Sequence, residues 1–135
     1  MRARLTIVAL LALAGCGGDD ADTSSPPQRG CTEIGCAPEG VEVDVQGLPA
    51  GNVEVALCVE DRRCVTGGTP ITGVLPKRGD RVRVTMIVRE DGREVARVTQ
   101  RLPVRVSRPN GPDCPPPCRY VRARFDVPSG ALEEV

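Results

Sequence analysis

Residues 81–101 read RVRVTMIVREDGREVARVTQR, and this stretch decides the fold. On both sides of Glu90-Asp91-Gly92, apolar residues alternate with polar ones, which is the pattern of half-buried β-strands. Two such stretches separated by a short segment that contains Asp-Gly predict a β-hairpin. The sequence therefore predicts antiparallel strands over 81–89 and 93–101.

The length of the turn sets which side chains face each other across this hairpin. A three-residue loop with Gly92 at positive φ pairs Met86 with Ala96, whereas a two-residue turn places Arg97 opposite Met86. Because the first register keeps one face of the hairpin apolar, we expect the three-residue loop.

In that register the other face of the hairpin carries a row of arginines, with Thr85 and Thr99 between them. Such a row suits an anionic partner: lipid headgroups, a cell-wall polymer or an acidic patch on a protein. The alternative is a solvated face whose long side chains cover apolar surface and discourage sheet stacking. The candidate residues for binding an anionic partner are Arg81, Arg83, Arg97 and Arg101.

Shorter alternating stretches surround the hairpin, and no helical pattern follows residue 16. About six or seven short strands with this spacing predict an all-β, antiparallel two-sheet sandwich of immunoglobulin-like or fibronectin-like type, with a small barrel as the alternative. The other expected strands cover residues 41–45, 53–59, 64–66, 104–106 and 120–127, and a Gly- and Pro-rich crossing covers 67–79.

The core of such a sandwich must be built mainly from valine and leucine. The chain has one Tyr, one Phe, no Trp and no His, and aliphatic side chains bury less area than aromatic ones. A modest core is well served by disulfides.

Beyond Cys16, six cysteines are available for disulfides. Cys58 and Cys64 flank a turn centred on Asp61, so they are expected to pair across a hairpin. Cys114 and Cys118 flank three prolines, whose polyproline II conformation would hold the two α-carbons ~12 Å apart. This exceeds the roughly 7 Å limit for a disulfide, so these two cysteines should not pair with each other.

Because Cys114 and Cys118 are not expected to pair with each other, each is expected to pair with Cys31 or Cys36. The sequence leaves open which of the two pairs with which. In many immunoglobulin-like sandwiches the first and last strands lie parallel and adjacent, which would bring Cys36 close to Cys118. The favoured pairs are therefore Cys31–Cys114 and Cys36–Cys118. Zinc is disfavoured because the spacings are irregular and histidine is absent, so no metal is expected.

Residues 1–16, MRARLTIVALLALAGC, begin with two arginines and continue with an apolar stretch. The stretch is far shorter than the ~20 residues that span a bilayer, and it resembles an export signal. Leu13-Ala14-Gly15-Cys16 resembles the lipobox of bacterial lipoproteins. That resemblance implies cleavage before Cys16 and lipidation of its sulfur.

The expected organisation follows from this motif. Residues 1–15 form the lipoprotein signal peptide, 16–30 a lipidated flexible tether and 31–135 the β-sandwich domain. The tether is small, polar and acidic, with a reach on the order of 20 Å. Removal of the signal leaves 16 basic and 18 acidic residues, and this balance argues against a nucleic-acid partner.

Two resemblances suggest another function for the cysteines. The Cys-x3-Cys of Cys114 and Cys118 is similar to the motif of copper-delivery proteins for respiratory oxidases, which also use a histidine on a thioredoxin-like fold. A lipid-anchored thiol redox protein would usually carry Cys-x2-Cys at a helix start. This chain has none of these further features.

Catalysis is not expected. Without histidine, a serine nucleophile lacks its usual base, and no hydrolase motif surrounds Ser107 or Ser129. We therefore expect a non-catalytic, cofactor-free binding or structural domain of the cell envelope, with its oligomeric state open. It is anchored to a membrane through Cys16, on the outer side of the cytoplasmic membrane or in the outer membrane. Its partner would be a protein or an anionic envelope polymer, and the stiff segment 109–118 is the candidate recognition loop.

Overall fold

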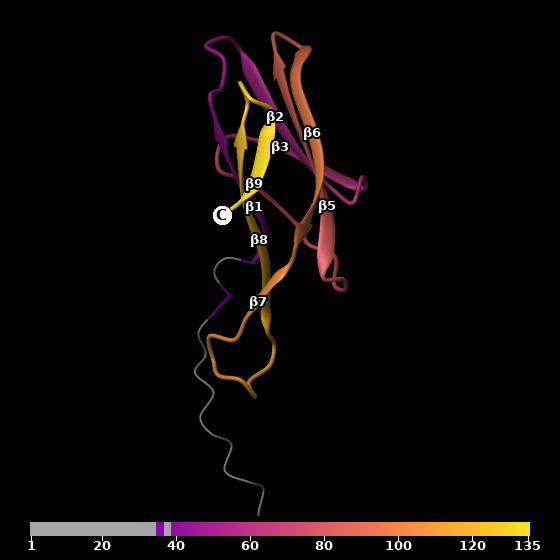
Figure 1. Ribbon diagram of the computed structural model, residues 1–135, viewed down its shortest axis with the longest axis vertical. Helices are drawn as coiled ribbons and strands as arrows, with labels where there is room; N and C mark the ends of the chain where they lie inside the picture. Colours follow the sequence, from indigo (N-terminus) through magenta and orange to yellow (C-terminus); the bar gives the residue numbers. More distant parts are fainter. Residues whose placement is uncertain (1–34, 37–38) are drawn as a thin grey trace, which may run out of the picture.

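The described residues form two β-sheets and no helix. A computed structural model describes residues 35–36 and 39–135, and the sheets face each other along the length of the molecule (Figure 1). The expected all-β, disulfide-stabilised two-sheet sandwich is confirmed. Within these residues, no segment is a helix long and apolar enough to cross a membrane.

The first sheet is built around two strands that lie parallel. β1 (Gly40–Gln46) pairs with β8 (Cys118–Asp126) from Gly40 opposite Tyr120 to Gln46 opposite Asp126. The other pairs in this sheet are antiparallel, with β4 on the free side of β1 and both β7 and β9 on the other side of β8. These three strands span Ile71–Gly73, Arg105–Ser107 and Ala131–Glu134.

The second sheet has the order β3-β2-β5-β6 and is antiparallel throughout. The long hairpin expected from residues 81–101 supplies β5 and β6, and β2 follows β1 along the chain. The four strands span Val53–Val59 (β2), Arg63–Gly67 (β3), Arg81–Glu90 (β5) and Arg93–Pro103 (β6).

The predicted register of the β5–β6 hairpin is wrong. Met86 lies opposite Val98, not Ala96. Asp91 and Gly92 form a two-residue turn with φ values of 50° and 78°, the backbone that a type I′ turn requires. A bulge then leaves Val95 without a partner, which restores an apolar residue opposite Met86.

Two short strands also lie where no strand was expected. β4 falls in the predicted crossing, and β9 follows the predicted last strand after a turn at 127–130. Each is only three or four residues long and is flanked by Gly or Pro, so alternation has little length in which to show. The two strands contact the opposite sheet, β4 on β2 and β3, and β9 on β6.

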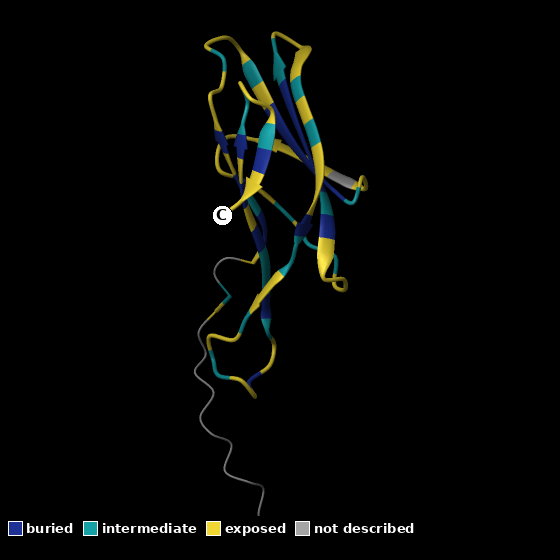
Figure 2. Ribbon diagram, in the orientation of Figure 1, coloured by how far each residue is buried: buried dark blue, intermediate teal, exposed yellow. Residues whose placement is uncertain are grey.

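The core lies between the sheets and is predominantly aliphatic (Figure 2). Phe125, Leu57 and Met86 are its largest fully buried side chains, and most of the others are valines. A fully buried side chain of this kind stabilises the fold by about 1.5–3 kcal/mol. The stability of the core therefore comes from many side chains, each of which contributes a modest free energy.

The long axis of the molecule has two distinct ends. At the end where the described chain begins, called the tether end below, lie Cys36, the starts of β1, β5 and β8, and the loops 74–80 and 108–117, whereas the turn 60–62 lies near the middle (Figure 1). At the far end lie the turns 47–52, 91–92 and 127–130. The far-end turns are joined by hydrogen bonds, such as Asp91 N to Asn52 O at 2.9 Å.

Candidate functional site

The arginine face is the outer face of the β5–β6 hairpin. Arg83 lies directly opposite Arg101, and Arg97 lies opposite Ile87. Thr85 and Thr99 face each other between them, with their hydroxyl oxygens 2.9 Å apart. The four predicted arginines share this face because the side-chain period of a strand is two, even though the pairing differs from the expected one.

Two of the four arginines are neutralised by carboxylates of the same chain. Arg83 Nη1 donates to Asp61 Oδ2 at 2.6 Å. Arg97 donates from Nε and Nη2 to the two carboxylate oxygens of Glu94, at 2.8 Å each. The hydrogen bond from Arg97 lowers the pKa of Glu94, and the hydrogen bonds that Arg83 and Arg97 donate to Asp61 and Glu94 raise the pKa of the two arginines.

The remaining two arginines carry the free positive charge of the arginine face. Arg81 donates from Nη2 to the backbone carbonyl of Arg101 at 2.9 Å, which holds it beside β6 without neutralising it. Arg101 is exposed and forms no ion pair with a described residue. The anion-binding capacity of this face is therefore concentrated at its tether-end half.

Beneath the arginines lies a small apolar cluster that the sequence analysis did not identify. Ala56, Cys58 and Ile87 are buried on the outer side of the second sheet, and Thr85 beside them is also buried. Covering such a cluster is a structural task for long side chains. Part of the arginine row therefore serves the fold.

The cysteines of the described residues are structural in their placement. The predicted bridge Cys58–Cys64 is present across the β2–β3 hairpin, with α-carbons 4.0 Å apart. The predicted bridge Cys36–Cys118 is also present, with α-carbons 5.2 Å apart. Cys118 is 1% exposed. Its sulfur is thus occupied by Cys36, not by Cys114.

Cys114 is buried and disulfide-bonded. Its predicted partner Cys31 lies outside the described residues, so the pairing of the two stays a prediction. Cys16, the predicted lipidation site, lies outside them as well. Cys114 belongs to the predicted recognition loop, which is held by turns such as Gly111 N to Arg108 O at 3.0 Å. The Pro115–Pro116 peptide is cis.

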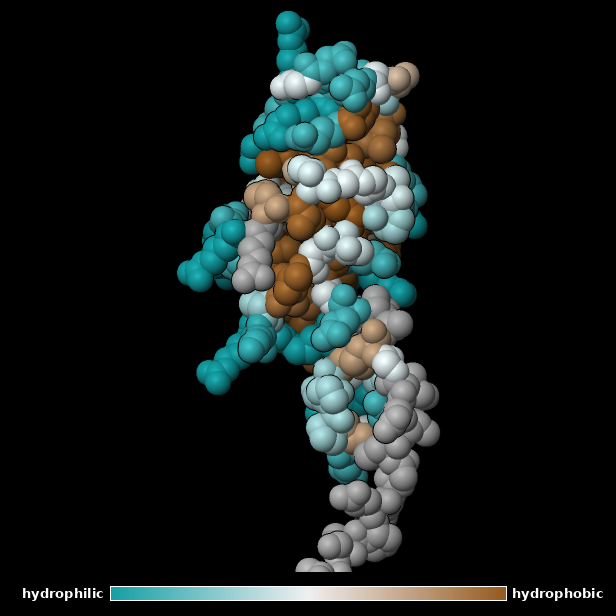
Figure 3. Space-filling view, turned by 180° about the vertical axis from the view of Figure 1, so that it is seen from behind, coloured by the Kyte–Doolittle hydropathy of each residue, from teal (hydrophilic) through white to brown (hydrophobic). Residues whose placement is uncertain are grey.

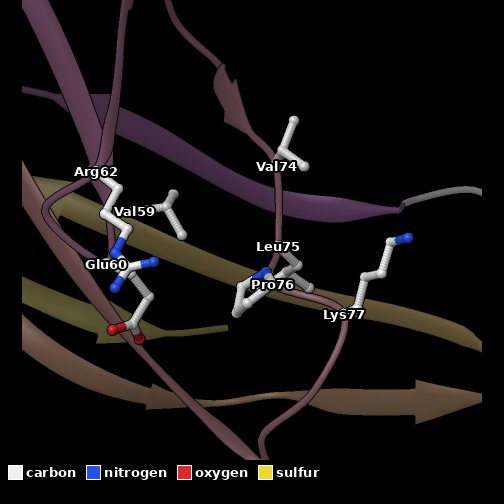
Figure 4. A pocket seen from close by; sticks show the side chains of 7 residues that line it. All are labelled: Val59, Glu60, Arg62, Val74, Leu75, Pro76 and Lys77. Atoms are coloured by element: carbon white, nitrogen blue, oxygen red, sulfur yellow. The ribbon is translucent and has the colours of Figure 1, made fainter.

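Two shallow hollows flank the segment 74–77 at the tether end, and sequence reasoning missed both. One, of about 310 Å³, is lined by Val59, Glu60, Arg62 and this segment (Figure 4). The other, of about 460 Å³, is lined by the same segment together with Glu39, Pro117 and Arg119. Val74, between them, is 65% exposed. The sequence of this segment predicts only a Gly- and Pro-rich crossing between strands, and no local pattern indicates that it lines two surface hollows.

On the side opposite to Figure 1, apolar surface lies between the polar ends of the molecule (Figure 3).

In the part of the chain that the structure covers, no cluster of acidic or cysteine side chains is arranged to hold a metal ion. Comparison with protein-family models, curated proteins and solved structures found no match to this chain.

Proposed function

We propose that this protein is an exported lipoprotein, held on a membrane of the cell envelope through lipidated Cys16, whose β-sandwich acts by binding or as a structural accessory. The observation that carries the proposal is the lipobox-like run Leu13-Ala14-Gly15-Cys16 at the end of a short apolar stretch. The polar segment that follows suits a tether better than an element of the fold.

The disulfides support export. Bridges of this kind persist in oxidising compartments and are rare in the cytosol. Cys36–Cys118 spans 82 residues and joins the start of β1 to the start of β8. A bridge in this position braces the sandwich, and burial of Cys118 protects it from exchange with external thiols.

A non-catalytic role is supported by the residue types available. The chain has no histidine, and the charged groups of the arginine face are engaged in ion pairs or backbone hydrogen bonds at Arg81, Arg83 and Arg97. Such groups can dock a partner but are not activated for proton transfer. The binding candidates are the arginine face and the loop 109–118.

Metabolic labelling tests the anchor. The full chain should incorporate an alkyne analogue of palmitate in a bacterial host and partition into the detergent phase of Triton X-114. Cys16→Ser should lose both properties, whereas Cys58→Ser, a matched control at another cysteine, should keep the label. Label that persists in Cys16→Ser would show that another site is acylated and would overturn the proposal.

A thiol titration tests the structural role of the cysteines. Under native conditions the purified chain should present no reactive thiol, and Cys118 should stay bridged after mild reductant, because it is bonded to Cys36 and is buried. If Cys118 were released by mild reductant while the fold remained intact, the bridge would be redox-active and the strut role would be wrong.

A further inference from the structure

The chain on the N-terminal side of the sandwich leaves from the tether end. Cys36 is bonded to Cys118 at the start of β8, and Gly35 precedes it (Figure 1). In the proposed organisation, residues 17–30 separate the lipidated Cys16 from the predicted bridge at Cys31, and a tether of that length would have a root-mean-square reach of roughly 20 Å. An anchor at Cys16 therefore holds the tether end nearest to the lipid.

The tether end carries an excess of positive charge. Its described side chains include six cations and three carboxylates. This surplus is hidden in the total composition, which is balanced. The cations are Lys77, Arg78, Arg81, Arg101, Arg108 and Arg119, and the carboxylates are Glu39, Asp80 and Asp113.

The far end has the opposite sign. It carries four arginines and seven carboxylates. The pairs Arg122–Glu42, Arg105–Glu134 and Arg83–Asp61 lie between the ends and cancel, as do the charges of Glu60 and Arg62 on the turn 60–62 (Figure 1). The domain is thus an electric dipole along its long axis, with its positive pole toward the anchor. The arginines are Arg89, Arg93, Arg97 and Arg124, and the carboxylates are Asp44, Glu54, Glu90, Asp91, Glu94, Asp126 and Glu133.

The positive pole is built to present its charges outward. Arg119 donates to the carbonyl of Pro76 at 2.7 Å and also to the carbonyl of Gly79, so it fastens the loop 74–80 to β8. This loop exposes Lys77 and Arg78, and neither forms an ion pair with a described residue. The two cations are held in place by backbone contacts that leave their side chains free.

We propose that the tether end docks on the anionic phospholipid headgroups of the membrane that holds the anchor, which sets the sandwich upright with its negative pole outward. The inference rests on the proposed function, because the anchor is what brings this end to the lipid. A membrane surface is favoured over a soluble polymer or protein because tethering gives it a high effective concentration at this pole alone. Negative headgroups attract basic residues only within about a Debye length, roughly 8 Å at physiological salt.

Lys77 provides the test, because it is the single lysine of the chain. The lipidated full chain, reconstituted in vesicles, is treated with an amine-acetylating reagent, and modification of Lys77 is followed by mass spectrometry. Vesicles of phosphatidylcholine alone are compared with vesicles that contain phosphatidylglycerol. Arg93→Lys adds a lysine at the far end as an internal control.

Docking predicts that acetylation of Lys77 slows several-fold in the anionic vesicles, since each basic residue near such a surface contributes roughly a fivefold gain in binding. The rate at residue 93 in Arg93→Lys should be the same in both vesicle types. Protection should disappear in about 1 M salt, where the Debye length falls to about 3 Å. Arg78→Glu with Arg108→Glu should abolish protection, whereas the far-end pair Arg93→Glu with Arg124→Glu should retain it.

Three outcomes would overturn the inference. Equal acetylation rates of Lys77 in both vesicle types would mean that the domain does not respond to the charge of the headgroups. Equal protection at residues 77 and 93 would mean that the domain has no preferred pole. Stronger protection by soluble poly(glycerol phosphate) than by vesicles would make an envelope polymer the partner.

Vesicle flotation separates this inference from the proposed function. If the chain floats only with anionic vesicles and carries no lipid by mass, the anchor at Cys16 is wrong but the docking surface stands. If it floats with both vesicle types and Lys77 reacts equally in both, the anchor stands and the docking surface is wrong.

Discussion

Glu94 and Arg97 lie on the same face of the second sheet although they are three residues apart on one strand. In a regular strand this spacing places side chains on opposite faces. The bulge at Val95 removes the conflict, because Glu94 lies opposite Arg89 and Arg97 opposite Ile87, both on the outer face. The bulge therefore aims Arg97 away from the core and toward its carboxylate partner.

Deletion of Val95 should be tolerated. Val95 is 48% exposed and has no partner on β5, and its removal leaves every other pair of the hairpin in register. We expect the free energy of unfolding, measured by urea denaturation, to fall by about 1 kcal/mol or less. The control is deletion of Val98, which reverses the faces of all β6 residues beyond it and should abolish cooperative unfolding. Comparable losses from both deletions would contradict this role for the bulge.

The ion pair Glu94–Arg97 should make the free energy of unfolding depend on pH. The pKa of Glu94 is lowered from its ordinary value of 4.5 by the hydrogen bond from Arg97. A lowered pKa contributes stability above the unfolded value, and this contribution is lost as the pH falls through the folded value. The difference in urea midpoint between the wild type and Glu94→Gln should thus be largest near pH 7 and shrink below pH 4.5. A difference that grew on acidification would have the wrong sign.

Glu60 should stabilise the β2–β3 turn through an exchange of hydrogen bonds with Arg83. The Arg83 amide donates to Glu60 Oε1 at 2.7 Å, and the Glu60 amide donates to the Arg83 carbonyl at 2.9 Å. Glu60→Ala should lower the free energy of unfolding by about 1 kcal/mol, because the Arg83 amide loses its acceptor. Glu60→Gln keeps an acceptor oxygen and should lose less than half as much. Equal losses in urea denaturation would mean that charge, not the acceptor, matters.

The two bridges should differ in their worth. Chain entropy assigns about 4.5 kcal/mol to a bridge that closes some 80 residues and about 2 kcal/mol to one that closes about six. The predicted bridge Cys31–Cys114 would close nearly the same loop as Cys36–Cys118, so the serine variant that removes both long bridges should lower the urea midpoint about twice as far as Cys58→Ser with Cys64→Ser. The reverse order would show that the hairpin bridge organises the fold more than the long bridges do.

Gly40 should not accept a side chain. Its φ is +98°, and a Cβ there would lie 2.5 Å from the carbonyl oxygen of Gly73 on β4. Gly40→Ala should cost at least about 2 kcal/mol, because backbone must move in addition to the strain of positive φ. Gly92→Ala is the control: its φ is also positive, but the space beside it is open. Similar thermal midpoints for the two variants would contradict the steric argument.

The strand period of two explains what the sequence could predict. It assigned Val84 and Met86 to the core and Arg81 and Arg83 to the outside, because this division depends only on alternation. The register was less accessible, since a two-residue turn followed by a bulge at Val95 preserves the apolar face as well as a longer loop does. Alternation alone does not distinguish the two.

The candidate surface was less predictable than the fold for a related reason. Neutralisation of Arg83 by Asp61 depends on how the β2–β3 turn lies against β5, a contact between residues 22 positions apart. The charge difference between the two ends depends on the parallel pairing of β1 with β8 and on the hold of Arg119 on the loop 74–80. None of these arrangements is encoded in a local pattern.

The bridge between Cys36 and Cys118 also has a mechanical consequence. β1 and β8 run in the same direction from this bond, so a pull on the chain before Cys36 is divided between two neighbouring strands. The load then acts along both strands, and the hydrogen bonds that join them are not opened one at a time from the end. Tension applied from the N-terminal side is thus borne by β1 and β8 together, the two central strands of the first sheet.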